Sequence, residues 1–273
     1  METLTLNSGH EIPQLGFGVF EIPPEETAEC VTVALEAGYR HIDTAKIYNN
    51  EAEVGQALAA SALPREDVFV TTKVWNSDQG YDQTLRAFET SMGKLDIDYL
   101  DLYLIHWPVA GSDSYVDTWK AMRKLNEEGR IRSIGVSNFQ RPHLEHLIDE
   151  TGIVPAANQI EIHPYLAQSV VRQADIDLGI VTEAWSPLAQ GTLEGDPLLE
   201  EIAGKHGRSV AEIALAWNLA LGNVVLTRST KAERIRSNID VLDIELDDDE
   251  ITRITQLDRD GRVGPHPDTF GRK

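Results

Sequence analysis

Four titratable residues with complementary chemistry, Asp43, Tyr48, Lys73 and His106, occur at or just after the ends of three short apolar segments. A tyrosine hydroxyl can give a proton to a carbonyl oxygen that is becoming an alkoxide, but its ordinary pKa of about 10 makes it a slow acid at neutral pH. A lysine ammonium beside the phenol favours the phenolate, and a carboxylate can hold that lysine charged and oriented. A histidine could donate a hydrogen bond to the same oxygen. The four residue types together predict proton transfer to a carbonyl group.

Each of these residues also has a structural explanation when taken alone. Asp43 could cap a helix, and Lys73 could be solvated at a strand end. Tyr48 could be an aromatic residue at a rim, and His106 could pack in the core. The catalytic interpretation depends on finding all four at matched strand ends.

The elements expected from the sequence would bring these residues to one place. From residue 15 onward, short apolar segments alternate with longer segments of helical period, and no linker rich in Pro, Gly or Ser interrupts the alternation. That order predicts parallel strands joined by helical crossovers. The expected strands are residues 15–19, 39–43, 68–73, 100–106, 131–137, 156–162, 180–185 and 224–227.

The segments between these strands have apolar residues on one side, as in Leu85, Phe88, Met92 and Leu95. The expected helices are residues 25–37, 50–58, 81–95, 115–128, 141–150, 170–178, 197–206 with 210–221, and 231–239. Eight pairs of strand and helix favour a closed (β/α)8 TIM barrel, as a single domain over residues 1–273. In such barrels the loops after the strands carry function.

Two pieces lie outside this pattern. Residues 4–12 predict an N-terminal hairpin that plugs the barrel floor, and residues 247–257 predict a tail helix near the C-terminus. No GxGxxG motif follows a strand and no GxxxxGK[ST] motif occurs, so the sequence signals neither a Rossmann crevice nor a P-loop.

The charge of the chain limits its partners. The sequence has 45 acidic and 24 basic residues among 273, which gives a formal net charge of −21. Nucleic-acid binders usually carry clustered Lys and Arg, so neither nucleic acid nor an anionic membrane surface is expected as a partner. Acidic residues spread along the whole chain predict a solvated carboxylate coat of the kind used in high salt. An ordinary acidic cytosolic protein is the alternative.

The location of the protein is predicted from what its sequence lacks. Cys30 is the one cysteine, which excludes an intramolecular disulfide, and it is expected to be buried in helix 25–37. Residues 1–10 have neither the basic nor the apolar region of a signal peptide, and no apolar stretch approaches about 18 residues. A soluble, cytoplasmic monomer is expected.

The motifs resemble those of the aldo-keto reductase family over essentially the whole chain. They are residues 41–51 (HIDTAKIYNNE), 72–73 (TK), 104–108 (LIHWP), 135–139 (GVSNF) and 158–161 (NQIE). The resemblance implies a catalytic tetrad of Asp43, Tyr48, Lys73 and His106. It makes Tyr48 the general acid when a carbonyl is reduced and the general base in the reverse direction.

The resemblance also implies that NADPH lies extended across the barrel mouth. It assigns the nicotinamide carboxamide to Ser137, Asn138 and Gln159. Trp185, where most members of the family carry Tyr, would offer a wide apolar face under the nicotinamide. The segment after it would follow the pyrophosphate with backbone donors, through Ser186, Leu188, Gln190 and Gly191.

The segment 227–234 (TRSTKAER) would bind the adenosine end of the cofactor. The family normally has Pro-Lys-Ser, and here Thr227 and Arg228 replace the Pro and the Lys. Two guanidinium groups suit a 2′-phosphate, and the N-terminal dipole of the following helix favours an anion. NADPH is therefore expected over NADH, and a solvated basic helix is the alternative. The residues assigned to this end are Arg228, Ser229, Arg234 and Asn238.

The substrate is expected to be a small carbonyl compound. Phe20, Trp75 and Trp107 could wall an apolar cleft, although any of them could be a core residue. The loop between His106 and the helix near residue 115 is short for the family, which implies an open pocket that accepts varied aldehydes and ketones. Residues 183–191 and 261–268 resemble the bacterial branch that contains 2,5-diketo-D-gluconate reductases.

Two alternatives complete the expectations. Some aldo-keto barrels are regulatory or structural proteins, so a catalytically weak barrel that binds NADPH is the competing function. Metal use has little support, because His41 with Asp43 and Glu161 with His163 are strand pairs without a third ligand at a diagnostic spacing. No metal is expected, since hydride transfer to a polarised carbonyl does not require one.

Overall fold

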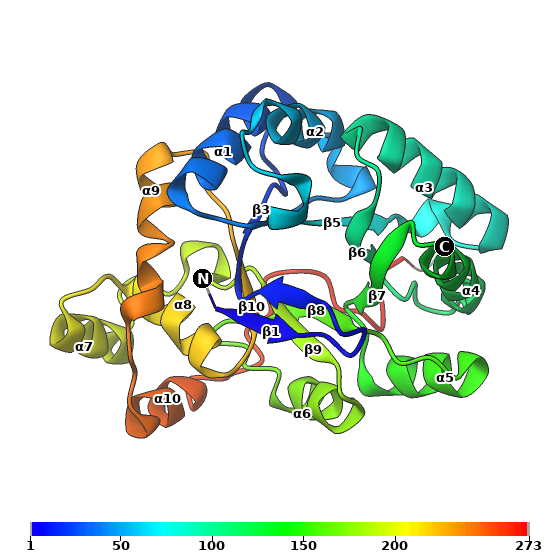
Figure 1. Cartoon of the computed structure of the whole chain (residues 1–273). Helices are drawn as coiled ribbons and strands as arrows, with labels where there is room; N and C mark the ends of the chain where they lie inside the picture. The colour runs from blue at the N-terminus through cyan, green and yellow to red at the C-terminus, as the bar shows by residue number, and fades with distance from the viewer. Residues whose placement is uncertain (1, 272–273) are drawn as a thin grey trace.

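Continuous apolar segments form the central strands of the molecule. Every residue of β5 (Phe69–Val74) and β6 (Leu100–Ile105) is buried. Parallel strands show such burial when helices cover one face and other strands of a barrel face the other. The computed structural model describes residues 2–271, and Figure 1 shows the strands enclosed by a ring of helices.

Eight parallel strands close the barrel in the order β10, β3, β4, β5, β6, β7, β8, β9. This confirms the predicted (β/α)8 barrel, and each observed strand overlaps its predicted segment. The remaining barrel strands are β3 (Leu15–Gly18), β4 (His41–Asp43), β7 (Ile131–Ser137), β8 (Ala157–Glu161), β9 (Val181–Trp185) and β10 (Val224–Thr227).

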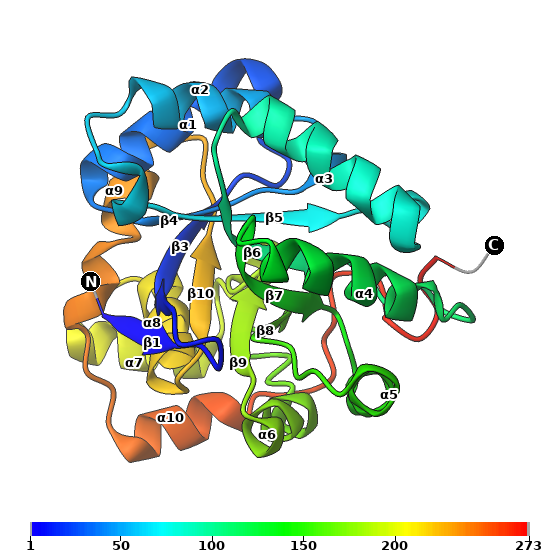
Figure 2. The ribbon, with the colours of Figure 1, turned by 45° about the vertical axis from the view of Figure 1, so that its right-hand side comes forward.

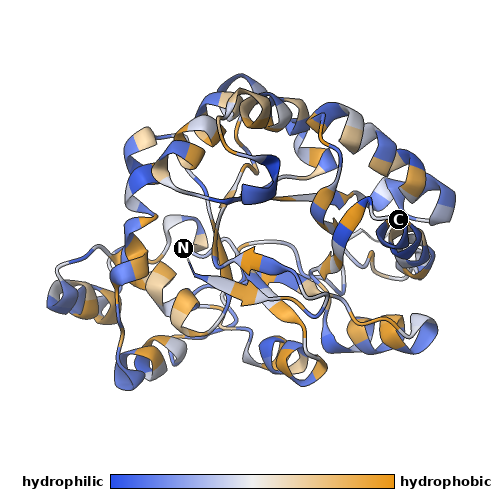
Figure 3. Cartoon of the chain, in the orientation of Figure 1, coloured by the Kyte–Doolittle hydropathy of each residue, from blue (hydrophilic) through white to orange (hydrophobic). Residues whose placement is uncertain are grey.

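The helices bury one face against the barrel, and Figure 3 shows apolar and polar patches alternating along them. In α3, for example, Phe88, Met92 and Leu95 are buried, and Leu85 is half-buried. The α-helices are α1 (Pro24–Ala37), α2 (Glu51–Ala60), α3 (Tyr81–Leu95), α4 (Ser114–Glu127), α5 (Arg141–Thr151), α6 (Ser169–Leu178), α7 (Pro197–His206), α8 (Val210–Ala220), α9 (Ala232–Ser237) and α10 (Asp248–Thr255). Short 3₁₀ helices are η1 (Lys46–Tyr48), η2 (Arg65–Asp67), η3 (Asn76–Asp78), η4 (Ala189–Gly191) and η5 (Asp240–Asp243).

Side-chain caps explain where some helices begin. At α8, Ser209 Oγ accepts from the Glu212 backbone N–H at 3.2 Å, and the Glu212 carboxylate accepts from the Ser209 N–H at 2.8 Å. The helix predicted over residues 231–239 is shorter than expected, because α9 has only 6 residues and Lys231 before it is extended. The dipole of so short a helix adds little to anion binding, which corrects that part of the sequence argument.

An N-terminal hairpin covers the end of the barrel where the strands begin, as Figure 1 shows. Its strands β1 (Thr3–Thr5) and β2 (Glu11–Pro13) are antiparallel. Leu6 and Ile12 are buried in one cluster with Phe69, Leu102 and Val224, from the starts of three barrel strands. The prediction of a hairpin that plugs the barrel floor is confirmed.

The C-terminal tail lies on the opposite side from that floor. After α10, the backbone N–H groups of Arg259 and Gly261 donate to the carbonyl of Tyr165 at 3.2 and 2.8 Å. Farther on, the Ala110 N–H donates to the carbonyl of Phe270 at 3.1 Å. Figure 2 shows this red segment running from α10 to the loop before α4. The tail therefore borders the loops that follow the barrel strands.

The acidic residues are not all at the surface. The buried ones are Asp43, Glu51, Asp101, Glu161, Asp175, Glu183 and Glu250. A buried carboxyl group is stable only when it is hydrogen-bonded, paired with a cation or protonated. Cys30 is buried, as predicted. Within residues 2–271, no helix has both the length and the hydropathy needed to cross a membrane.

Candidate active site

The four titratable residues predicted from the sequence meet at the carboxyl end of the barrel. Asp43 ends β4, Lys73 lies near the end of β5, Tyr48 ends η1, and His106 follows β6. Lys73 Nζ is fully buried and donates to Asp43 Oδ1 at 2.6 Å and to the Tyr48 hydroxyl at 3.4 Å. A third bond goes to the carbonyl of Thr44 at 2.9 Å. One ammonium group therefore connects the carboxylate to the phenol.

The environment of Lys73 keeps it charged. Burial alone would lower the pKa of Lys73. Asp43 and Tyr48 together raise the pKa by more than burial lowers it, so the pKa of Lys73 lies above its ordinary value. The pKa of Tyr48 is raised to about 12, because burial and the charge of Asp43 outweigh the lowering effect of Lys73. The expectation that Lys73 favours the phenolate is therefore right for that one interaction, although the phenol as a whole holds its proton more firmly than in water.

His106 lies beside the phenol. The rings of Tyr48 and His106 are T-shaped with centroids 5.6 Å apart, and the Trp75 ring lies 5.1 Å from His106 on another side. Burial, and then the charge of Lys73, lower the pKa of His106 well below its ordinary value. The imidazole is therefore neutral at pH 7, and it can act as a hydrogen-bond donor from one nitrogen only.

The ends of β7 and β8 bring Ser137, Asn138 and Gln159 together. Ser137 pairs with Gln159 in the strand register, and Ser137 Oγ donates to the Gln159 carbonyl at 2.7 Å. Asn138 is in the left-handed region at φ 64° and donates from Nδ2 to the His106 carbonyl and to Ser137 Oγ, both at 3.0 Å. Gln159 Nε2 donates to Asp43 Oδ2 at 3.0 Å. Two of the residues predicted to bind the carboxamide are thus hydrogen-bonded to the four titratable residues, Asn138 to His106 and Gln159 to Asp43.

Trp185 ends β9 with its indole half-buried. Its Nε1 donates to Asn138 Oδ1 at 3.0 Å, which fixes the five-membered ring. In the loop that follows, Ser186, Ala189 and Gln190 have φ between 47° and 54°, and Gly191 has φ 87°. Left-handed residues other than glycine are uncommon and cluster at functional sites. Of the other residues predicted in this loop, Leu188 is half-buried, and Gln190 and Gly191 are exposed.

The basic segment lies after β10. Arg228 and Arg234 are exposed, Ser229 is half-buried, and Asn238 is buried. Arg228 Nη1 donates to the Phe20 carbonyl at 3.2 Å and lies 3.5 Å from Glu21. Both guanidinium groups can therefore reach an anion at the surface, and Arg228 also connects this segment to the loop after β3.

Aromatic residues lie around Tyr48 and His106. Phe20 is 51% exposed, and its ring centroid lies 5.0 Å from that of Tyr48. Trp107 is only 6% exposed, because Phe270 of the tail packs on it with centroids 4.5 Å apart. Phe270 also lies 6.3 Å from the Trp75 ring. The tail thus covers Trp107.

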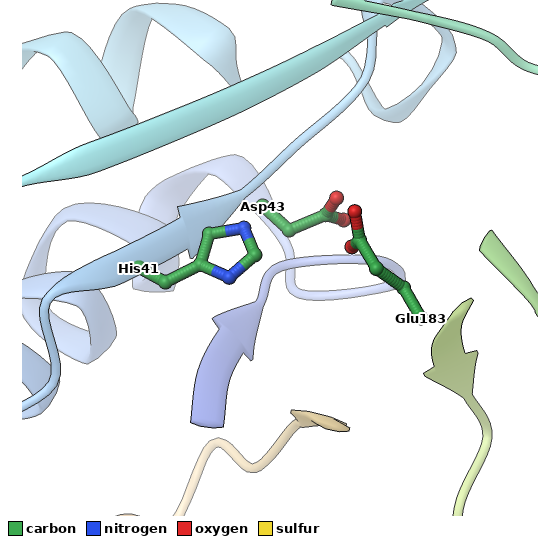
Figure 4. Close-up of side chains that lie close together, drawn as sticks. All are labelled: His41, Asp43 and Glu183. Atoms are coloured by element: carbon green, nitrogen blue, oxygen red, sulfur yellow. The ribbon is translucent and has the colours of Figure 1, made fainter. Parts of the chain in front are cut away.

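Sequence reasoning gave no role to two buried glutamates at the site. Glu183 pairs with Gln159 in the strand register and accepts from Gln159 Nε2 at 3.0 Å. Figure 4 shows its carboxyl group facing Asp43, with the His41 ring beside them. One ring nitrogen of His41 and one carboxylate oxygen each of Asp43 and Glu183 all lie within 4.8 Å of one another. The strand pair of His41 and Asp43 therefore does gain a third neighbour in space. The sequence signal that could have found Glu183 is its spacing from Trp185, because residues two apart on a strand point to the same face.

Those three side chains do not form a free set of metal ligands. Asp43 Oδ1 is bonded to Lys73, and its Oδ2 is bonded to Gln159. A divalent cation here would lie next to a buried ammonium group, which opposes it. The absence of a metal stays a prediction.

Glu161, which the sequence indicated only as a motif residue and a poor metal ligand, is the second of these glutamates. Its two carboxylate oxygens accept from the backbone N–H groups of Val263 and Gly264 at 2.6 and 3.0 Å, and His163 Nε2 lies at 3.0 Å. This anchor holds Gly264 against Trp185, since a Cβ placed on Gly264 would come within 2.4 Å of Trp185 Cη2. The tail therefore supports the six-membered ring of the indole, and Asn138 supports the other end.

The chain is similar to known proteins along nearly its whole length. The model of the Aldo/keto reductase family matches residues 14–259. An aldo-keto reductase of Mycolicibacterium smegmatis is 56% identical over 98% of this chain and 97% of its own length. Glyoxal reductase of Bacillus subtilis is 49% identical over 98% of this chain and 96% of its own length. A crystal structure of a Gox0644 variant in complex with NADPH superimposes with a TM-score of 0.94 at 45% identity, and the match covers 98% of both chains.

Proposed function

The chain belongs to the aldo/keto reductase family, and on that premise we propose how its own residues carry out the reduction of carbonyl compounds by NADPH. NADPH supplies the hydride when it is bound. The observation that carries the assignment of roles is the buried chain of hydrogen bonds from Asp43 through Lys73 to Tyr48. The substrate carbonyl lies beside the Tyr48 hydroxyl in this proposal.

Tyr48 is the general acid. As the carbonyl carbon is reduced, negative charge develops on its oxygen, and the Tyr48 hydroxyl gives that oxygen its proton. Lys73 stabilises the phenolate that remains, and Asp43 keeps Lys73 charged and in place. His106, with its proton on Nε2, donates a hydrogen bond to the same oxygen and orients the substrate. In the reverse direction Tyr48 accepts the proton of an alcohol, so the enzyme acts on CH–OH donors.

The residues around the mouth fit NADPH chemically. Both hydrogens of Gln159 Nε2 are used inside the protein, which leaves its Oε1 to accept from the carboxamide. The Trp185 indole offers a half-buried apolar face for the nicotinamide, and the left-handed loop 186–191 suits the pyrophosphate. Arg228 and Arg234, with Ser229 between β10 and α9, bind the 2′-phosphate, and Asn238 completes that end.

The substrate class is small aldehydes and ketones. Phe20 and Trp75 form the apolar sides of the carbonyl site. Trp107 contributes indirectly, by packing against Phe270. Because a close relative is named glyoxal reductase, we propose small dicarbonyl compounds such as glyoxal and methylglyoxal as the first substrates to test. A 2,5-diketo-D-gluconate type of substrate is the second choice.

An assay of NADPH consumption with this panel tests the proposed function. Turnover of at least one small aldehyde, with formation of the alcohol, is the expected result. Tight NADPH binding without turnover of any compound would instead favour the regulatory or structural barrel. A protein that binds no NADPH would contradict both functions.

The remaining properties are proposed from the sequence. We propose that residues 1–273 act as one domain, of which the first residue and the last two lie outside the described residues. A cytoplasmic monomer with a salt-adapted acidic surface and no nucleic-acid partner fits the net charge of −21.

A further inference from the structure

A second buried carboxyl group, that of Glu183, lies beneath the catalytic residues. It projects from β9 into the barrel, and its side chain is fully buried. Figure 4 shows Glu183 facing Asp43 across the interior. Glu183 Oε2 accepts from Gln159 Nε2 at 3.0 Å, and Oε1 has no hydrogen-bond partner among residues 2–271. Glu183 takes no part in the proton transfer proposed for Tyr48, Lys73 and Asp43.

Among residues 2–271, no cation without a partner lies near Glu183 to balance a negative charge on it. The titratable and charged groups that face it are His41 and Asp43 from β4 and Lys73 from β5. Lys73 is already bonded to Asp43 at 2.6 Å. Burial lowers the pKa of His41 to about 4, so its imidazole is neutral at pH 7.

A fully buried carboxyl group in these surroundings takes up a proton instead of remaining ionised. Gln159, the one residue in the described part of the chain that donates a hydrogen bond to it, is neutral, and the nearby Asp43 is negatively charged. Burial, and then the charge of Asp43, raise the pKa of Glu183 to about 8. The geometry and the direction of this shift agree.

We propose that Glu183 is a positioning residue that keeps its proton at neutral pH, fixes the amide of Gln159, and leaves Asp43 as the one carboxylate beneath the site. The inference rests on the proposed function. Asp43 Oδ2 and Glu183 Oε2 both accept from Gln159 Nε2, so turning the amide over would break both hydrogen bonds and place the amide oxygen against the Asp43 carboxylate. By fixing the amide in this orientation, Glu183 keeps Gln159 Oε1 facing the place of the nicotinamide carboxamide.

Ionisation of Glu183 would weaken the general acid. A second negative charge near Lys73 would stabilise the proton on the Tyr48 hydroxyl, so that Tyr48 would give it up less readily. The pKa of Tyr48 itself is raised to about 12, so its own titration lies above the range in which Glu183 ionises. The rate of reduction should therefore fall as the pH rises past about 8 in the wild-type protein.

Single-turnover reduction between about pH 6 and pH 9 tests this, with the protein preloaded with NADPH. We expect the wild-type rate to fall several-fold over this range, and the rate of Glu183→Gln to stay level relative to its own value at neutral pH. Asp175→Asn is the matched control. Burial raises the pKa of Asp175 to about 7, but Asp175 is bonded to Asn158 and Thr182 at 3.0 and 2.9 Å and has no bond to the tetrad. Asp175→Asn should lose rate with pH as the wild type does.

An alkaline fall in Glu183→Gln equal to that of the wild type would overturn the proposal, and so would a wild-type rate that stays level. The comparison between two buried acids matters because both substitutions remove a carboxyl group from the interior. A general loss of packing would affect both variants, whereas the proposed role affects only one.

Unfolding in urea gives a second measurement that needs no turnover. The unfolded chain ionises Glu183 near its ordinary pKa of about 4.3, while the folded chain keeps the proton until about pH 8. Between those values the folded state holds one more proton, so the stability of the wild type falls with rising pH relative to Glu183→Gln. The measured quantity is the difference in urea midpoint between the wild type and Glu183→Gln. If this difference were the same at about pH 5 and about pH 8, the proposal would be overturned. Absence of turnover in every protein would count against the proposed function, and the unfolding result would still decide the state of Glu183.

Discussion

Lys73 has two functions that cannot be separated by changing it. Its ion pair with Asp43 is fully buried, and breaking such a pair by removing one partner costs about 3–5 kcal/mol. A loss of activity after substitution of Lys73 or Asp43 would therefore combine lost chemistry with lost stability. Tyr48 is only half-buried, and its hydroxyl can be removed while the ring keeps its contacts with Phe20 and His106. It is the better residue for testing the mechanism.

The exposed side chains of Arg228 and Arg234 give a second prediction about individual residues. If Arg228 and Arg234 bind the 2′-phosphate, the double substitution Arg228→Ala with Arg234→Ala should weaken NADPH about ten-fold or more, since a charged hydrogen bond contributes about 1.5–3 kcal/mol. NADH, which lacks that phosphate, should be affected little. Fluorescence titration with both cofactors measures the two losses.

Arg236→Ala is the control for this substitution, because Arg236 is also exposed on α9 and lies 4.0 Å from Glu36. It removes one positive charge from α9, as Arg234→Ala does. Equal losses of NADPH and NADH affinity in the double variant would show that the guanidinium groups do not distinguish the 2′-phosphate.

At the scale of elements, the order of strands and helices could be predicted because each has its own periodicity. The apolar run 100–106 and the amphipathic segment 81–95 are examples of patterns that local sequence determines. The predicted strand ends also brought Asp43, Tyr48, Lys73 and His106 to one end of the barrel, where the structure has them. What sequence reasoning missed depends on distant segments: the tail reaches Glu161 through backbone N–H groups of residues 263 and 264, and any residue type supplies those. Phe270 on Trp107 likewise joins segments far apart in the chain.

The tail provides a prediction at this scale. In Gly264→Ala, the new methyl group would lie within 2.4 Å of Trp185 Cη2, so the indole or the tail must move. Overpacking of this kind costs about 1–3 kcal/mol. We expect weaker NADPH binding and a lower Tm, because the displaced indole no longer presents the same face to the nicotinamide.

Gly204→Ala is the matched control, since Gly204 lies in α7 with no atom within 4 Å of an added Cβ. It should leave NADPH affinity unchanged and raise or maintain the Tm. Wild-type NADPH affinity in Gly264→Ala would contradict the role of the tail in supporting Trp185.

The whole molecule carries a charge that opposes its cofactor. With 45 acidic and 24 basic residues, most of its surface repels an anion, so the basic residues near α9 must act against the general field. Self-repulsion among the exposed carboxylates also destabilises the folded chain at low ionic strength. Salt screens charges separated by more than about 10 Å at 0.1 M, which affects this repulsion more than it affects close ion pairs.

Thermal unfolding should therefore depend on salt. We expect the Tm to rise as KCl is increased from a few millimolar to molar concentrations, because screening relieves the repulsion in the folded state. Sucrose at equal osmolality serves as the uncharged control and should not reproduce the same concentration dependence. A Tm that is constant or falls with KCl would contradict a salt-adapted surface.

The role of Tyr48 as proton donor is the central claim, and the substitution Tyr48→Phe tests it most directly. The measurement is the rate of NADPH oxidation with a small aldehyde, made alongside the Kd for NADPH. Loss of the general acid should reduce kcat by a factor of about 10² to 10⁴, while the Kd for NADPH stays near the wild-type value. Reduction at a rate close to that of the wild type would contradict the account.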